Sequence, residues 1–370
     1  MTMPPALARS ASVSALTIAA LTATTGIGVA APTTAPAAAS APAAAVSSAV
    51  TTDAPVTYVQ SVAALSNLPA LTSAKWRSGA WVGGYMSASR AQRWGTWRGT
   101  ASTATPTFPE RGSWRAIERS TWHISTYKGF KGLLIYGMPL LPNGSKASDL
   151  RNVAAGKHDG TFRKVARDLK AHGRGNSVIR IGWEANGTWW AWSANASQAK
   201  DYRNAFRRAA QVMNKEAPGL QFAFDINCGS VMPGQTHRLD ALNKLYPGND
   251  VVDIIGCSAY DWAEAGATNE AQWKRALHPP NSVGIGDVST FTRARGKRLG
   301  FGEWGLAPRH RNGHGDNPYF IRKMYLFFNG NRGKLAYECY FNEPDSSMSN
   351  SLWSEAPQNP KSAAMYRKLW

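Results

Sequence analysis

The chain has 370 residues, with 42 Lys and Arg against 23 Asp and Glu, and carries a formal net charge of +19 at pH 7. Charged residues interrupt every apolar run after the amino-terminal region, so the composition excludes collagen, coiled-coil and polytopic membrane proteins. Arg9 and Asp53 are the only charged residues among the first 74, so residues 75–370 carry the whole excess charge, and all 15 tryptophans. A segment of that length can bury the core of one domain.

Residues 1–30 are predicted to be a secretory signal peptide. Arg9 precedes an apolar run at 13–29, and the small residues Ala30 and Ala31 follow it. A retained membrane anchor is the alternative, but the run is short for a span and no charged stop follows it. Residues 31–74 are rich in Ala, Pro, Thr and Ser, which is typical of a disordered linker. We therefore expect a secreted, extracellular or wall-associated protein with no membrane span after cleavage.

Beyond residue 75, short apolar segments predict β-strands at 80–85, 100–108, 132–138, 178–183, 220–227, 251–258, 298–303 and 334–341. Helical periodicity lies between several of them, most clearly at 161–172 and 198–215. This alternation indicates the α/β class with a parallel sheet, and eight units favour a closed (β/α)8 TIM barrel. An open doubly wound sheet is the alternative, but Gly83 and Gly84 do not begin a dinucleotide-binding GxGxxG motif.

Two glutamates follow apolar strands, where a barrel of this kind places its chemistry. Glu184 and Glu303 are both flanked by Trp and Gly. Hydrolysis of a glycosidic bond needs such a pair, one acid to protonate the leaving oxygen and one carboxylate to attack the anomeric carbon or activate water. The alternative is structural, with each Glu paired to a buried arginine such as Arg180. Two such residues together favour catalysis.

Other polar and aromatic residues fall at strand ends or in nearby loops. Tyr85, Tyr136, Asn227, Tyr260 and Tyr340 stand at strand ends, where Asn227 is expected either to contact substrate or to cap the strand. Tryptophans offer flat faces on which sugar rings stack, and they gather here as Trp183, Trp189, Trp190, Trp192, Trp262 and Trp304. If the strand continues, Trp183 points away from Glu184.

Residues 180–192, Arg-Ile-Gly-Trp-Glu-Ala-Asn-Gly-Thr-Trp-Trp-Ala-Trp, resemble the acid/base segment of glycoside hydrolase family 26 in its actinobacterial branch. Residues 302–305, Gly-Glu-Trp-Gly, resemble the nucleophile strand of that family. The similarity includes 138–142, 253–256, Tyr260-Asp261 and 315–320, and so covers most of residues 80–345. It implies that residues 75–370 form a (β/α)8 glycoside hydrolase domain.

The resemblance implies a retaining mechanism with Glu184 as general acid/base and Glu303 as nucleophile, their carboxyl groups about 5 to 5.5 Å apart. Tyr260 would hydrogen-bond the nucleophile. The substrate-binding set is predicted to be Arg180, Asn186, Trp189, Trp192, Asn227, Tyr260, Trp262, Trp304 and Tyr340. The implied substrate is a β-linked polysaccharide cleaved internally, β-mannan first, with other β-glycans or anionic wall polymers and exopolysaccharides as alternatives. Trp183 stands where family mannanases commonly have His, a departure that bears on the sugar.

The three cysteines leave two possibilities. Cys228 and Cys257 could form a disulfide if their strands are neighbours, but three cysteines leave one unpaired and no CxxC pair exists, so buried free thiols are preferred, including Cys339. The spacing matches no metal-ligand motif, and we expect neither a metal nor a cofactor.

The positive charge gathers in Arg163, Lys164, Arg167, Lys170 and Arg174, in Arg203, Arg207 and Arg208, and in 293–298. Solvated helix faces are the favoured explanation, and attraction to an anionic glycan or cell surface is the alternative. Two other classes stay open: a non-catalytic carbohydrate- or cell-surface-binding protein on the same barrel, and a basic adhesion or nucleic-acid-binding protein. No nucleic-acid motif supports the last, so we expect no nucleic-acid partner, and a monomer.

Overall fold

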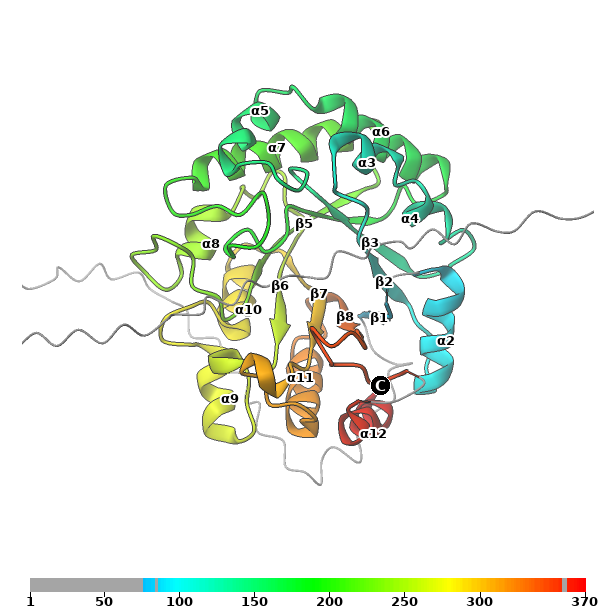
Figure 1. Cartoon of the computed structure of the whole chain (residues 1–370), viewed down its shortest axis with the longest axis vertical. Helices are drawn as coiled ribbons and strands as arrows, with labels where there is room; N and C mark the ends of the chain where they lie inside the picture. Colours follow the sequence, from blue (N-terminus) through cyan, green and yellow to red (C-terminus); the bar gives the residue numbers. More distant parts are fainter. Residues whose placement is uncertain (1–75, 84–85, 355–357) are drawn as a thin grey trace, which may run out of the picture.

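The computed structural model describes residues 76–83, 86–354 and 358–370. The predicted signal peptide, the predicted linker and Tyr85 lie outside these ranges. Eight parallel strands hydrogen-bond in chain order and the last pairs with the first, which closes the sheet into a barrel (Figure 1). The strands are β1 (Arg77–Trp81), β2 (Ala104–Thr107), β3 (Leu133–Met138), β4 (Val178–Ile181), β5 (Gln221–Asn227), β6 (Ile254–Tyr260), β7 (Arg298–Gly305) and β8 (Leu335–Phe341). The predicted (β/α)8 barrel is confirmed.

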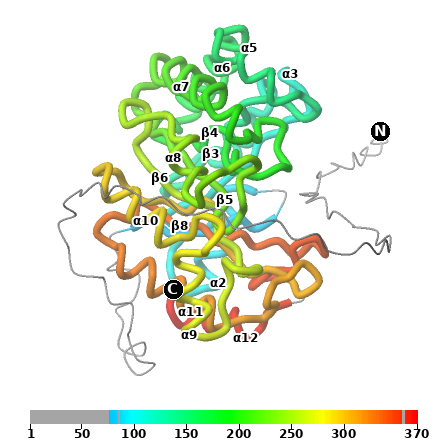
Figure 2. The backbone as a smooth tube through the Cα atoms, turned by 90° about the vertical axis from the view of Figure 1, so that its left-hand side faces the viewer, coloured from blue at the N-terminus to red at the C-terminus, as the bar shows by residue number. Residues whose placement is uncertain are grey.

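Helices surround the barrel, with α5, α6 and α7 on one side and α9, α11 and α12 on the opposite side (Figures 1 and 2). The α-helices are α2 (Ala88–Arg98), α3 (Trp114–Arg119), α4 (Trp122–Ser125), α5 (Leu150–Ala154), α6 (Asp159–Ala171), α7 (Ala199–Glu216), α8 (Asp240–Leu245), α9 (Glu270–Leu277), α10 (Ile285–Ala294), α11 (Pro318–Gly330) and α12 (Pro360–Leu369). Short 3₁₀ turns occur at η2 (Ala147–Asp149), η3 (Ala263–Ala265) and η4 (Arg309–Arg311).

Local sequence explains where these helices form and which face they bury. In α6, Phe162, Val165, Ala166 and Leu169 recur at helical spacing and are all buried. The helix thus presents one apolar stripe to the sheet and keeps its charges outside. In α11, the side chain of Asn317 accepts a hydrogen bond from the first turn.

The end of β4 departs from the sequence prediction in a way that matters for the site. The predicted strand 178–183 ends at Ile181, because Gly182 and Glu184 have φ of +50° and +57° in the left-handed region. A non-glycine residue there costs about 1–2 kcal/mol. The turn breaks the alternation of side chains, so Glu184 and Trp183 need not point to opposite faces.

The barrel interior is divided along its axis. One end is filled by a small cluster of side chains, Ala104, Ile135, Val178, Ala223, Ile254, Ala336, Tyr337 and Cys339. Toward the carboxyl ends of the strands the interior becomes polar, with Arg180, Asp225 and Ser258 all buried. The polar end is the one expected to hold chemistry in this fold.

Cys228 and Cys257 form a disulfide with their Cα atoms 5.7 Å apart, so the preference for free thiols was wrong for this pair. The bond forms because β5 and β6 are neighbours in register, with Ile226 opposite Cys257. Cys339 is free and buried, as predicted.

Most of the basic side chains on α6 and α7 have partners. Arg163 and Arg208 both pair with Asp159, and Arg167 pairs with Glu216. Ion pairs occupy part of these two clusters, whereas Arg174 is buried and donates to the backbone oxygens of Gly132 and Phe130 rather than facing solvent. No helix in the described part of the chain is long and apolar enough to span a membrane.

Candidate active site

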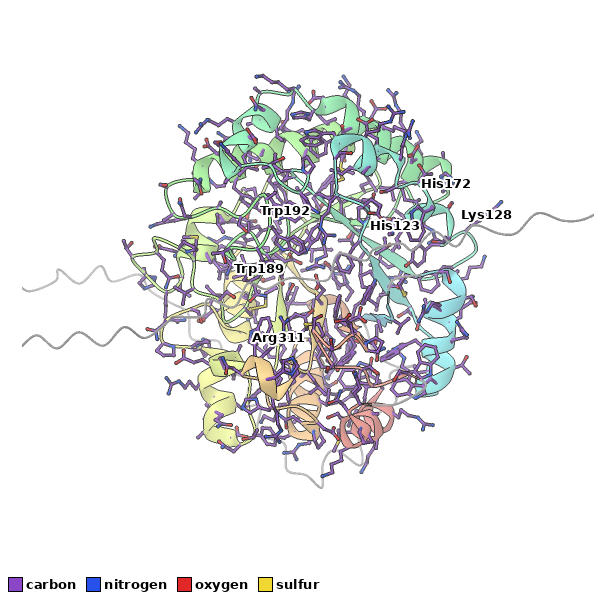
Figure 3. The ribbon with its side chains drawn as sticks, viewed as in Figure 1. His123, Lys128, His172, Trp189, Trp192 and Arg311 are labelled. Atoms are coloured by element: carbon purple, nitrogen blue, oxygen red, sulfur yellow. A yellow bond between two sulfur atoms is a disulfide. The ribbon has the colours of Figure 1, made fainter. Side chains whose placement is uncertain are left out.

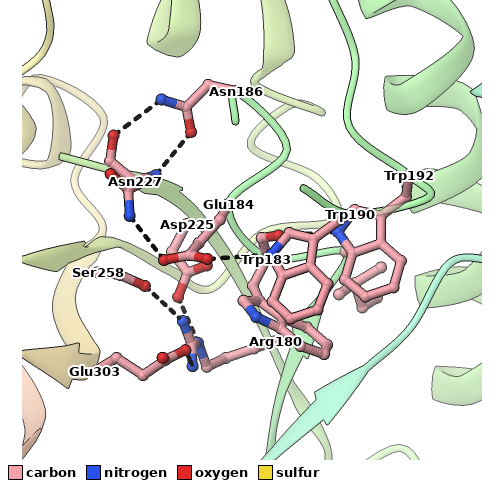
Figure 4. Close-up of polar contacts among 12 residues, drawn as sticks. Arg180, Trp183, Glu184, Asn186, Trp190, Trp192, Asp225, Asn227, Ser258 and Glu303 are labelled. Carbon is pink, nitrogen blue, oxygen red and sulfur yellow. Dashed lines mark hydrogen bonds and ion pairs between the residues drawn. The ribbon is translucent and has the colours of Figure 1, made fainter. Parts of the chain in front are cut away.

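The site is organised around Arg180, a fully buried guanidinium on β4. Its Nε donates to Asp225 Oδ2 at 2.5 Å, its Nη1 to Glu303 Oε1 at 2.8 Å, and its Nη2 to Ser258 Oγ at 3.2 Å (Figure 4). One cation thus ties β5, β6 and β7 to β4. Because all four groups are buried, the contacts are made in a medium where charge interactions are strong.

The shape of β7 lets Glu303 reach this arginine. The pairing of β7 with β8 shifts register between Phe301 and Trp304, which marks a bulge. A Cβ added to Gly302 would lie 2.5 Å from Arg180 Nε, so Gly302 is required for space. Two successive residues of β7 therefore lie next to Arg180: Gly302, which leaves room for the guanidinium, and Glu303, which pairs with it.

Glu184 is held differently, by neutral N–H donors. Its Oε2 accepts from Trp189 Nε1 at 3.0 Å and from Trp190 Nε1 at 3.1 Å, and its Oε1 accepts from Asn227 Nδ2 at 2.9 Å. The side chain is buried, and its backbone N–H donates to Asp225 O at 3.2 Å. Charge-assisted hydrogen bonds of this kind fix the position of a carboxylate.

Asn227 and Asn186 form an interlocked pair behind Glu184. The Asn227 backbone N–H donates to Asn186 Oδ1 at 2.7 Å, and Asn186 Nδ2 donates to Asn227 O at 2.9 Å. Ser230 Oγ donates to Asn227 Oδ1 at 2.6 Å, which leaves the Asn227 amide facing Glu184. Asn186 therefore acts on Asn227 rather than lining the site, and Asn227 positions Glu184.

Glu303 has a second partner in Tyr260, whose hydroxyl donates to its Oε2 at 3.1 Å. This is the contact that the family resemblance implies. Trp262, half-buried, lies against Tyr260 with ring centroids 5.2 Å apart. The aromatic pair therefore lies immediately beside the second carboxylate.

Burial raises the pKa of Glu303 to about 7, although Arg180 acts to lower it, and the charge of Glu184 raises it further. Burial likewise raises the pKa of Asp225 against the effect of Arg180. The structural alternative of a buried ion pair therefore holds for Glu303 but not for Glu184, whose hydrogen-bond donors are neutral.

The structure places three predicted substrate-binding residues away from the carboxylates. Trp304 follows Glu303 on β7 and so faces the opposite side, where its Nε1 donates to Glu338 at 2.6 Å. Tyr340 is buried and donates to Asn350 O at 2.7 Å. Trp192 is fully buried, and its Nε1 donates to Trp183 O at 2.9 Å. Packing within the protein occupies all three, so their assignment to the substrate surface is corrected.

Trp189 and Trp190 remain at the site, and Figure 3 shows Trp189 and Trp192 in the same region of the molecule. Trp183 packs against Trp190 and Trp192 with centroid distances of 5.1 and 4.7 Å. Its indole thus supports the loop.

Sequence reasoning missed Asp225, Ser258 and Arg111. Asp225 stands two residues before Asn227 on β5, and the two-residue period of a strand could have placed both in the barrel interior. Ser258 could have been found in the same way from Tyr260 on β6. Arg111, whose guanidinium lies 4.7 Å from the Trp190 ring centroid, follows β2 in an irregular loop, where no periodic signal exists. In the described residues, no group of three or more His, Cys, Asp and Glu could hold a metal ion.

Fold and site together define a (β/α)8 barrel with buried glutamates at the carboxyl ends of β4 and β7. The family model for glycosyl hydrolase family 26 matches residues 159–296, a range that includes Glu184 and ends before Glu303. A mannan endo-1,4-beta-mannosidase from Bifidobacterium adolescentis is 27% identical over 172 residues, or 43% of this chain. The match spans 16% of that relative's length. Residues 159–296 of the chain are thus similar to glycoside hydrolase family 26.

Solved structures share the fold at low sequence identity. The catalytic domain of an endo-beta-1,4-mannanase from Bacillus sp. JAMB-750 gives a TM-score of 0.51 at 17% identity, covering 69% of each chain. Fungal beta-1,4-galactanases give a TM-score of 0.54 at 13% identity, covering 80% of this chain and 100% of theirs. At such identities these structures support the barrel architecture alone.

Proposed function

We propose that the protein is a secreted, endo-acting, retaining glycoside hydrolase that cleaves a β-linked polysaccharide. The observation that carries the proposal is the pair of buried carboxylates, Glu184 and Glu303, held by different partners at the carboxyl ends of β4 and β7. Different surroundings allow two carboxyl groups to take different protonation states, as an acid and a nucleophile must.

In the proposed mechanism, protonated Glu184 donates its proton to the leaving glycosidic oxygen while Glu303 attacks the anomeric carbon. The bond to the leaving sugar breaks as the bond to Glu303 forms, which gives a covalent glycosyl-enzyme. Glu184 then takes a proton from water as the water oxygen attacks the anomeric carbon, and the bond to Glu303 breaks, which frees the sugar with net retention. Arg180 and Tyr260 orient the Glu303 carboxylate, and Asn227 and the two indoles orient Glu184.

For the substrate, β-mannan is the first candidate. The curated relative is a mannan endo-1,4-beta-mannosidase, which supports mannan, and the galactanases of similar fold make β-galactan the next polymer to test. Trp183 replaces the His that family mannanases commonly carry before the acid/base. Because its indole supports the Trp190 loop, this replacement bears on which sugar the site accepts.

Export is the other part of the proposal. The disulfide between Cys228 and Cys257 supports an extracellular location, because structural disulfides persist in oxidising compartments. In this proposal residues 1–30 are removed, residues 31–74 form a linker, and residues 75–370 act as a monomeric hydrolase domain.

The test is digestion of a panel: β-mannan, mixed-linkage glucan, xylan, galactan, arabinan and acidic exopolysaccharides. We expect new reducing ends from at least one polymer, with a ladder of oligosaccharides of mixed size. Glu303→Gln serves as the matched inactive protein. Binding of a polymer with no new reducing ends would support the non-catalytic carbohydrate-binding alternative, and release of only mono- or disaccharides would contradict internal cleavage.

A further inference from the structure

Arg111 lies in the loop that follows β2, on the same end of the barrel as the two glutamates. Its backbone oxygen accepts a hydrogen bond from Asn143 N at 2.7 Å, which fixes this loop to the one after β3. Its guanidinium lies 4.7 Å from the ring centroid of Trp190, whose Nε1 donates to Glu184. A cation is therefore stacked on the indole that directly contacts the proposed acid/base.

This cation has no anionic partner of its own. Its Nε is buried and has no hydrogen-bond partner, and no carboxylate in the described part of the chain lies within ion-pair distance. Arg180 is matched by Asp225 and Glu303, and Arg238 by Asp287, whereas the buried Arg98 and Arg174 donate to neutral oxygen atoms. For Arg111 Nε the described residues supply neither an anion nor a neutral acceptor.

Desolvation lowers the pKa of Arg111, and the charges of Glu110 and Glu303 offset this only in part. An unpaired charge is costly, and a bound anion would compensate it. The guanidinium lies over the Trp190 ring, and its terminal nitrogens can donate the two parallel hydrogen bonds that a carboxylate accepts. A neutral sugar hydroxyl could accept from a terminal nitrogen but would leave the charge uncompensated.

We propose that Arg111 binds a carboxylate on the substrate, so that the preferred substrate is a β-linked glycan with a uronate or similar acidic group near the cleaved bond. This inference rests on the proposed function, since it assigns the polymer class that the Glu184 and Glu303 site accepts. It makes Arg111 a specificity-determining residue, distinct from the two carboxylates that perform the reaction.

The test uses matched polymers that differ in charge only. β-Mannan, mixed-linkage glucan and β-galactan are each prepared native, partly oxidised at C6 to carboxylate, and oxidised then reduced again to the alcohol. Binding is measured on Glu303→Gln, which keeps polymers intact, and on the same protein with Arg111→Gln added. Lys128→Gln in the same background is the control, because it removes one exposed positive charge at the opposite, amino-terminal side of β3.

We expect at least one oxidised polymer to bind about tenfold or more tightly than its native and re-reduced forms, the value of one hydrogen-bonded charge pair. Arg111→Gln should remove this preference and leave binding of neutral polymers nearly unchanged, while Lys128→Gln should keep it. An equal loss for charged and neutral polymers, or no preference for any oxidised polymer, would overturn the inference. Because binding is read without hydrolysis, loss of the carboxylate preference and failure of the hydrolase proposal are separate results.

Discussion

Arg180 and Glu303 form a buried ion pair, with Nη1 and Oε1 2.8 Å apart and both side chains almost free of solvent exposure. The same guanidinium also binds Asp225, so one positive charge faces two carboxyl groups. The arrangement favours the ionised form of Glu303, which a nucleophile needs, while burial opposes it. This balance between burial and the ion pair sets the pH at which Glu303 becomes ionised and can act as the nucleophile.

The first prediction concerns the two glutamates. Glu303→Gln should lower kcat by more than about a thousandfold, because it removes the nucleophile, and Glu184→Gln by about a hundred- to ten-thousandfold. The measurement is the rate of new reducing ends on the polymer that the panel selects. Full activity in Glu303→Gln would remove this residue from the mechanism.

The pH dependence of activity follows from the pKa of Glu303, which is raised to about 7. A nucleophile must be ionised, so kcat/KM should rise with pH through about 7 and fall about tenfold per unit below it. A profile of kcat/KM from pH 4.5 to 9 on a neutral polymer checks this. An acidic limb with its midpoint below pH 5 would contradict this expectation, because it would mean that Arg180 lowers the pKa of Glu303 by more than burial raises it.

Replacement of Trp189 by Phe tests the hydrogen bonds on Glu184. The change keeps an aromatic ring but removes the Nε1 donor that lies 3.0 Å from Oε2. Loss of one hydrogen bond to a charged group should lower kcat about tenfold to a hundredfold and shift the pH profile. Trp114→Phe is the control, because Trp114 stacks on His158 and touches neither glutamate. An unchanged pH profile with only KM raised would make Trp189 a sugar-stacking residue alone.

The disulfide should contribute to stability. Cys228 and Cys257 are 29 residues apart, and a cross-link closing such a loop stabilises a protein by about 3–4 kcal/mol. We expect a reductant to lower the Tm of the wild-type protein, and to have no effect on the Cys228→Ala, Cys257→Ala variant. Loss of the disulfide should also lower activity. Asn227 precedes Cys228 and contacts Glu184, and Ser258 follows Cys257 and contacts Arg180. An equal Tm with and without reductant would contradict a stabilising disulfide.

Sequence periodicity predicted the barrel because strands and helices alternate clearly from β3 to β8. It could not place the end of β4, because the turn at Gly182 and Glu184 depends on left-handed backbone rather than on an apolar pattern. It also gave β1 the wrong bounds, since the structure begins that strand at the exposed Arg77.

For the site, the glutamates could be proposed from the strand-end rule, but their partners could not. The pairing of Glu303 with Arg180 depends on the bulge in β7 and on the space at Gly302. The periodicity of apolar residues in the sequence predicts neither feature. The wrong assignment of Trp304 to the substrate surface could have been avoided, because the residue next to an inward-facing Glu303 in a strand faces outward. Trp192 required the loop itself, since its indole turns inward to bond Trp183 O.

The stereochemistry of the first product distinguishes a retaining mechanism from an inverting one. A polymer cleaved in the panel is digested in an NMR tube, and the anomeric protons of new reducing ends are followed before mutarotation. We expect the β-anomer to appear first with wild-type protein and no new reducing ends to appear with Glu303→Gln. An α-anomer formed first would contradict the covalent role of Glu303 and the retaining mechanism built on it.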